Sequence, residues 1–259
     1  QHYKIIGGCY DTAKRSSLID IYKNHSLEYG ISFHINDSVV SPDSSTLFTT
    51  SGMQQYKPLY SDSHYFDTFS NIQRCLRLND WNEIGDKTHY LVFDMIGLFS
   101  SQQWSLKQSI DFMWRFLGKI GIIPDYITIH PDKLSEWSPL YYEYGVEIKT
   151  DQECIWGDGN IQGYCTEFYK NDIEIGNIVN TLDKSIDIGF CLERLLTIIH
   201  DNNEPLSKLN ILEHTYFQLL KDNFTIGNKN QGHIMKKIVI ECVLLGSKIE
   251  DNNFNRIRN

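Results

Sequence analysis

The sequence predicts an α+β fold that ends in a small helical appendage, and two observations support this prediction. Up to about residue 200, short stretches of alternating apolar and polar residues are interspersed with amphipathic helical patterns. Beyond residue 200, the apolar residues recur only with helical spacing. We therefore expect residues 1–200 to form a mixed body and residues 201–259 to form the appendage.

The N-terminal segment is expected to contain one long helix followed by short strands. Residues 1–14 show no clear pattern, whereas residues 14–29 carry apolar side chains at helical spacing and end before a glycine. Residues 31–35 and 46–50 favour strands. Pro42 lies between them in a segment rich in Ser and Asp, which predicts a turn.

The central part of the chain predicts a strand pair, a helix and a further strand. Two strand-prone stretches, 71–80 and 89–100, enclose a polar loop at 79–87 and are expected to pair antiparallel. Residues 106–118 form an amphipathic pattern with a glycine at the exit, which indicates a helix. Residues 125–131 alternate and end in proline, as expected for a short strand.

The last segments are expected to be one alternating strand at 173–180, followed after residue 200 by helices. The helices are predicted at 206–221 and 233–249, with an Asn- and Gly-rich loop between them. The final residues, 250–259, are polar, and we expect them to be frayed.

The stretch "SIDIGFCLERLL" raises the first functional question. Its alternating residues 186–189 lead into a helical pattern that begins at Leu192 and has Arg194 in its first turns. An arginine at the positive end of the helix dipole is unfavourable unless a negative group lies in front of it. Arg194 is therefore half of a surface ion pair or a ligand for an anion such as phosphate.

Charge and composition exclude several classes of protein. The net charge of −9 argues against a broadly basic nucleic-acid-binding surface. The six cysteines are scattered without a C-x-x-C pair, so we expect free thiols in a reducing compartment and no zinc site. No apolar run is long enough to span a bilayer and no signal peptide is evident, which predicts a cytoplasmic or organelle-matrix protein. The sequence starts with Gln1, and we expect a few residues to be missing or processed.

Three segments together resemble the catalytic core of the alanyl-tRNA synthetase family, a family of class II aminoacyl-tRNA synthetases. The first segment reads "LFTTSGMQQYKP" and is similar to the family's "LFTNAGMxQFKP". The second contains "QRCLR", "ND" and "FDMIGLFS" and resembles motif 2, "QRCxR…ND…FEMLGNFS". The third runs through "IW", "GYCTEFY", "IEIGNIVN" and "SIDIGFCLERL" and is similar to "FW…GPCTEIFY…EIWNIVF…SVDTGMGLER", which ends in motif 3. Their order is kept over residues 15–200.

The resemblance implies a fold and a reaction. The fold would be a class II synthetase-like, six-stranded antiparallel sheet flanked by helices, with residues 1–200 as the catalytic domain. Residues 201–259 contain "GNKNQGHIMKKIVIECVLLGSKI", which resembles the start of the family's tRNA-recognition helices. The implied reaction is the attack of an amino-acid carboxylate on the α-phosphorus of ATP with Mg²⁺, which yields an aminoacyl adenylate. The family also implies a possible homodimer through the motif 1 region, here around Pro42.

The resemblance assigns ATP-binding roles to three residues. Arg77 matches the motif 2 arginine that contacts the α-phosphate, and Arg194 matches the motif 3 arginine that holds the distal phosphates. These two are the expected catalytic residues, because phosphate transfer depends mainly on positioning and on charge stabilisation by fixed cations. Phe93 matches the aromatic residue that packs on adenine. A surface arginine and a core phenylalanine are the alternative interpretations of Arg77 and Phe93.

A second set of residues is assigned to the amino acid. Asp187 matches the carboxylate that receives the ammonium group of the substrate, and its alternative interpretation is a helix cap. Met53, Trp156 and Asn177 match positions that line the pocket for a small amino acid. Gly189 matches a motif 3 glycine that allows the backbone to approach the substrate closely.

The sequence also departs from the family pattern at the expected site. Four residues are missing between Leu78 and Asn79 and one before His89, so we expect a shorter motif 2 loop. Cys191 replaces a glycine and is expected to narrow the space near the nucleotide. Gly176 replaces a tryptophan and is expected to widen the amino-acid pocket.

Three functions agree with these departures. The first is activation of a small amino acid and its transfer to an acceptor other than tRNA, such as a carrier-protein thiol or a small amine. The negative net charge and the loss of basic residues from the appendage favour it. The second is a minimal alanyl-tRNA synthetase that contacts the acceptor stem of tRNA-Ala. The third is an inactive module that binds an amino acid or a nucleotide, and retention of Arg77, Asp187 and Arg194 argues against it.

Overall fold

The computed structural model describes residues 10–61, 65–200 and 205–259. Most of the irregular lead-in predicted at residues 1–14 lies outside these ranges, and its last residues already belong to helix α1 (Thr12–Glu28). No helix among the described residues is long and apolar enough to cross a membrane.

A single sheet of nine strands organises the described body. The strands are β1 (Ser32–Asn36), β2 (Phe69–Leu76), β3 (Val92–Ser100), β4 (Tyr126–Ile129), β5 (Glu147–Thr150), β6 (Ile155–Asp158), β7 (Ile161–Lys170), β8 (Ile173–Thr181) and β9 (Ile186–Cys191). Their order is β1-β2-β3-β9-β8-β7-β4-β5, and β6 pairs with β7 outside this path.

The six strands from β2 to β4 in this order are all antiparallel to their neighbours, as the sequence resemblance implies. The sheet extends further than that expectation, because the edge strands β1 and β5 join it in parallel and β6 is added to β7. The sheet is therefore mixed, with an antiparallel centre.

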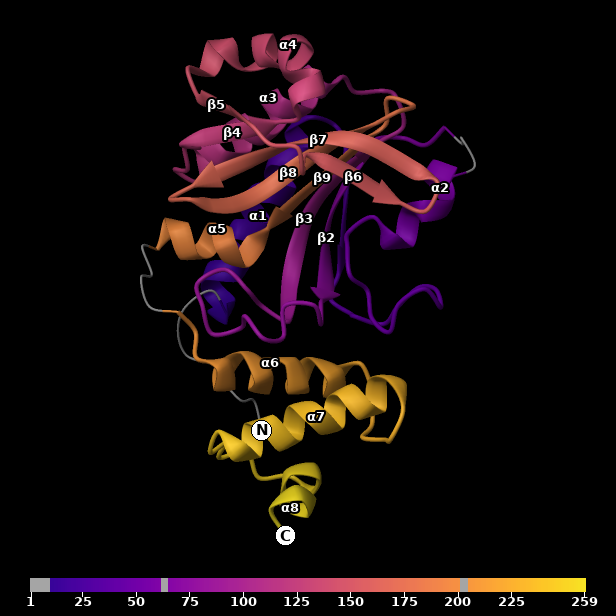
Figure 1. Ribbon diagram of the computed structural model, residues 1–259, viewed down its shortest axis with the longest axis vertical. Coiled ribbons are helices and arrows are strands. Elements are labelled where there is room, and N and C mark those ends of the chain that lie inside the picture. The colour runs from indigo at the N-terminus through magenta and orange to yellow at the C-terminus, as the bar shows by residue number, and fades with distance from the viewer. Residues whose placement is uncertain (1–9, 62–64, 201–204) are drawn as a thin grey trace.

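Three helices cover one face of the sheet, and the opposite face carries a pocket. They are α1, α3 (Leu106–Lys119) and α5 (Leu192–Ile199), while α2 (Lys57–Ser61) and α4 (Leu134–Trp137) lie elsewhere on the body (Figure 1). Helix α3 begins with a capping box, in which the Ser105 hydroxyl accepts from the Gln108 backbone N–H and the Gln108 side chain accepts from the Ser105 backbone N–H. Its apolar side faces the strands, as its sequence pattern predicts.

Three helices follow the body in the last part of the chain: α6 (Lys208–Lys221), α7 (Asn230–Leu244) and α8 (Asn252–Arg258). They lie together at one end of the molecule (Figure 1). Helix α6 also touches the body, because Gln218 accepts a hydrogen bond of 2.9 Å from Arg74 on β2. The proposed domain boundary at residue 200 adjoins residues 201–204, which lie outside the described residues, so the division into two domains stays a proposal.

Several sequence predictions of secondary structure are corrected. Residues 46–50 form no strand, only a single bridge between Val40 and Phe48. The second appendage helix ends at Leu244 rather than residue 249, because Gly246 adopts a φ of +83° that ends helical geometry. The tail expected to fray contains helix α8, which is capped by Asp251 and anchored by the fully buried Phe254.

Candidate active site

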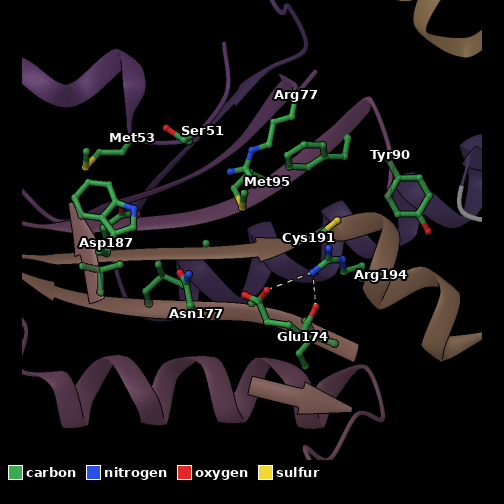
Figure 2. Close-up of a pocket in the computed structure, with 18 of the residues that line it drawn as sticks. Ser51, Met53, Arg77, Tyr90, Met95, Glu174, Asn177, Asp187, Cys191 and Arg194 are labelled. Atoms are coloured by element: carbon green, nitrogen blue, oxygen red, sulfur yellow. Dashed lines mark hydrogen bonds and ion pairs between the residues drawn. The ribbon is translucent and has the colours of Figure 1, made fainter. Parts of the chain in front are cut away.

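The eight residues predicted from the sequence line a single pocket on the face of the sheet opposite α1, α3 and α5. They are Met53, Arg77, Phe93, Trp156, Asn177, Asp187, Gly189 and Arg194. In the view of Figure 2, Asp187 and Met53 lie toward one end of the pocket, and Arg194 and Tyr90 lie toward the other. The structure thus assembles these residues from segments that are far apart in the sequence.

Arg77 follows β2 and presents a guanidinium group to the pocket. Its Nε donates a hydrogen bond of 2.8 Å to the Thr50 carbonyl oxygen, and its guanidinium carbon lies 5.1 Å from the centroid of the Phe93 ring. Among the described residues no carboxylate forms an ion pair with Arg77. These contacts orient the side chain and leave its terminal nitrogens available to an anion.

Arg194 projects from the first turn of α5 and is held by two backbone carbonyls. Its Nε donates to the Thr88 oxygen at 3.1 Å and its Nη1 donates to the Glu174 oxygen at 2.7 Å. The Glu174 carboxylate completes a longer ion pair of 3.5 Å (Figure 2). The two alternatives for Arg194 are therefore compatible, because it has an ion-pair partner and still faces the pocket.

Glu174 is a pocket residue that the sequence patterns did not identify. Strand β8 contains a bulge, because Phe168 pairs with Gly176 while the next residue, Tyr169, pairs with Glu174. Ile175 is the extra residue, so the alternation of side chains shifts by one before Gly176. The bulge therefore brings Glu174 to the same face as Asn177, where strict alternation would have placed it on the opposite face.

Asp187 on β9 is a carboxylate without a partner in the described part of the chain. Burial in the pocket raises its pKa from the usual value of 3.8 to about 7, and no neighbouring cation opposes this rise. A buried carboxylate without a cationic partner is costly in free energy, and a ligand cation would compensate its charge. It does not cap α5, whose N-cap position is Cys191, so the alternative interpretation as a helix cap is wrong.

The predicted widening of the pocket at Gly176 does not follow from the structure. A Cβ atom at this position would lie 2.2 Å from Phe190 Cγ and 2.6 Å from the Gly189 carbonyl oxygen. The Phe190 ring thus fills the space beside Gly176. Gly189 itself faces the pocket, and a Cβ there would lie 3.1 Å from the Met95 sulfur.

The loop between β2 and β3 lines the pocket through Asp80 and Thr88 and packs against the appendage. The Lys237 ammonium on α7 lies 4.1 Å from the centroid of the Trp81 ring, and Gly85 adjoins Lys208 on α6. The appendage thus supports the loop from outside. Cys191 also lines the pocket.

A buried ion cluster lies behind the pocket, and the sequence patterns did not identify it. Arg15 on α1 pairs with Asp94 on β3 and with Glu193 on α5, the latter at 2.6 Å. Arg74 on β2 contacts Asp94 at 2.9 Å, and the Glu193 carboxylate accepts from the Asp94 backbone N–H. These contacts fix β3 and the start of α5, which carries Arg194.

Comparisons with known proteins agree on one class. The chain matches the family model described as tRNA synthetases class II (A) over residues 19–156. The alanine–tRNA ligase of Buchnera aphidicola is 26% identical over 301 residues, which cover 83% of this chain and 34% of that protein. The alanine–tRNA ligase of Legionella pneumophila is 26% identical over 312 residues, which cover 91% of this chain and 36% of that protein.

The chain spans about a third of the length of these curated relatives. Among solved structures, a histidyl-tRNA synthetase from S. aureus superposes with a TM-score of 0.49 at 10% sequence identity. That superposition covers 75% of this chain and 68% of the other.

Proposed function

Because the chain belongs to the class II (A) tRNA synthetases, we propose that its pocket joins ATP and a small amino acid as an aminoacyl adenylate. One observation carries this proposal: a single pocket has two arginines for phosphate groups and a carboxylate, without a partner among the described residues, for an ammonium group. This charge pattern complements the two substrates, since ATP is an anion and an amino acid carries a cationic nitrogen beside a carboxylate.

The residues have distinct tasks in the proposed reaction. Asp187 holds the ammonium group, so that a carboxylate oxygen of the amino acid faces the α-phosphorus. That oxygen forms a bond to phosphorus, the bond from phosphorus to the bridging oxygen breaks, and pyrophosphate leaves with the electron pair. Arg77 stabilises the charge at the α-phosphate and Arg194 that of the leaving group. Phe93 provides an aromatic surface for the base.

The pocket also offers oxygen ligands that suit Mg²⁺. Glu174 faces the pocket beside Arg194, and Asp80 lines it from the loop between β2 and β3. Carboxylates are the ligands that Mg²⁺ takes when it binds together with nucleotide phosphates. When bound, the ion would neutralise negative charge on those phosphates. Glu174 is the residue that we expect to hold it.

The proposed amino acid is alanine, which suits a pocket bounded by Met53, Trp156 and Asn177. For the acceptor we favour a carrier-protein thiol or a small amine, because the net charge is −9 and the appendage has lost basic residues relative to the tRNA-recognition helices that it resembles. Charging of tRNA-Ala is the second candidate, and the names of the relatives from Buchnera and Legionella favour it.

Amino-acid-dependent exchange of pyrophosphate into ATP tests the activation step. We expect exchange with alanine and a drop of about 10²–10³-fold in kcat for Arg194→Ala, the effect of removing one preorganised donor. Arg115→Ala is the matched control, because Arg115 is an exposed arginine on α3. No exchange with any amino acid would indicate a binding module instead. If exchange is observed, transfer assays with tRNA-Ala would show whether the acceptor is this tRNA or another molecule.

A further inference from the structure

Two buried thiols and a carboxylate converge beside the pocket, although their sequence spacing predicted no metal site. One ligand atom from each of Cys154, Cys165 and Glu167 lies within 4.8 Å of the other two. Cys154 immediately precedes β6, and its carbonyl oxygen accepts a hydrogen bond of 3.0 Å from the Cys165 backbone N–H. Cys165 and Glu167 are two residues apart on β7, so their side chains share a face. Strand pairing therefore creates a cluster that the C-x-x-C criterion misses.

The surroundings of this cluster are acidic. Glu167 lies with the two thiols, and the Glu174 carboxylate lies close enough to interact with it electrostatically. Within the described ranges, Glu167 forms no ion pair with Lys, Arg or His. The Cys154 and Cys165 side chains are at most 3% exposed. A half-buried carboxylate beside two buried thiols is a costly arrangement unless a cation accompanies it.

We propose that Cys154, Cys165 and Glu167 bind one zinc ion. Zn²⁺ takes thiolate and carboxylate ligands in tetrahedral geometry, in which ligand atoms lie roughly 3.5–3.8 Å apart, so the cluster needs to contract by only about 1 Å. The Thr128 hydroxyl lies 3.1 Å from the Cys154 sulfur and 3.3 Å from a Glu167 oxygen, so it adjoins the cluster. Tyr169 donates a hydrogen bond of 2.7 Å to Glu167 and orients it.

The zinc ion would fasten β6 to the sheet. Strand β6 pairs with β7 alone among the described strands, and Cys154 stands at its start. Trp156, two residues further on, packs against both cysteines and lines the pocket. Cys165 lies opposite Val179 on β8, which in turn lies opposite Asp187 on β9. The ion would thus position Trp156 from beside the pocket, whatever reaction the pocket performs.

Metal analysis of the full chain tests the site without any activity assay. After incubation with zinc sulfate and desalting, we expect about one zinc ion per chain by mass spectrometry. Cys154→Ser and Glu167→Gln should each lower this content at least tenfold, while Cys242→Ser, a buried cysteine of α7, should retain it. Cobalt(II) in the wild-type protein should give thiolate-to-metal charge-transfer bands that Cys154→Ser lacks.

Other outcomes would overturn the proposal. Zinc content near zero in the wild-type protein, or equal content in Cys154→Ser, would show that the cluster does not bind the ion. Glu167→Gln keeps both thiols and therefore serves as a second variant in case Cys154→Ser unfolds. Circular dichroism would show whether either variant is unfolded. A non-reduced mass about 2 Da below that of the reduced chain, lost in Cys154→Ser, would show a disulfide instead of a metal site.

Discussion

At the scale of the residue, the ionisation of Asp187 is expected to control amino-acid binding. Its pKa is about 7 because burial disfavours the charged form. An ammonium ligand needs the carboxylate, so the KM for the amino acid should fall as the pH rises through about 7. Asp187→Asn should raise this KM about 10- to 100-fold, the effect of losing a charged hydrogen bond of about 1.5–3 kcal/mol, and should flatten its pH dependence. An unchanged pH profile in the variant would assign the titration to another group.

The same carboxyl group makes a second prediction, on stability. Burial raises its pKa in the folded protein to about 7, above the usual value of 3.8. Between these values the unfolded chain releases the proton while the folded chain keeps it, so this contribution to stability is lost as the pH rises. Urea unfolding without ligand should therefore show a steeper decline from about pH 4 to about pH 7 in the wild type than in Asp187→Asn. If stability falls equally with pH in both proteins, the decline is caused by another group.

At the scale of the element, β8 shows what the sequence could and could not predict. The alternating residues of 173–180 predict the strand, and the resemblance assigns Asn177 to the pocket. The bulge at Ile175 depends on pairing with β7 and β9, so the local pattern could not place Glu174. Strand β6 also escaped prediction, because it is short and contains a glycine, and the Cys154 cluster depends on its pairing.

The close contact between the paired strands β8 and β9 leads to a prediction about stability. Gly176→Ala would place a methyl group 2.2 Å from Phe190 Cγ, and overpacking of this kind costs roughly 1–3 kcal/mol. Gly118→Ala is the control, since a Cβ there meets nothing within 4 Å and the residue is helical. It should stabilise the protein by up to about 1 kcal/mol. In thermal unfolding, Gly176→Ala should therefore lower the Tm and Gly118→Ala should raise it. Equal shifts in the two variants would contradict the packing argument.

At the scale of the whole molecule, the sequence resemblance predicted the antiparallel centre of the sheet and the helices that cover it. It did not predict the parallel edges. The segment of β5 is mostly exposed, so apolar alternation is weak there and only tertiary pairing with β4 defines the strand. The buried ion cluster was also unpredictable, because Arg15 and Glu193 lie 178 residues apart in the chain and meet only after folding.

This cluster connects the N-terminal helix, the sheet and the appendage, so its loss should affect the whole fold. Arg15→Met leaves the buried Glu193 without its arginine partner, and breaking a buried pair in this way costs about 3–5 kcal/mol. Urea unfolding should show this loss, while the exposed control Arg115→Met should change stability by less than about 0.5 kcal/mol. Adding Glu193→Gln to Arg15→Met should restore part of the loss, because the uncompensated charge is removed. If the double variant is as unstable as the sum of the single variants, the two side chains stabilise the fold independently and the ion pair does not connect its parts.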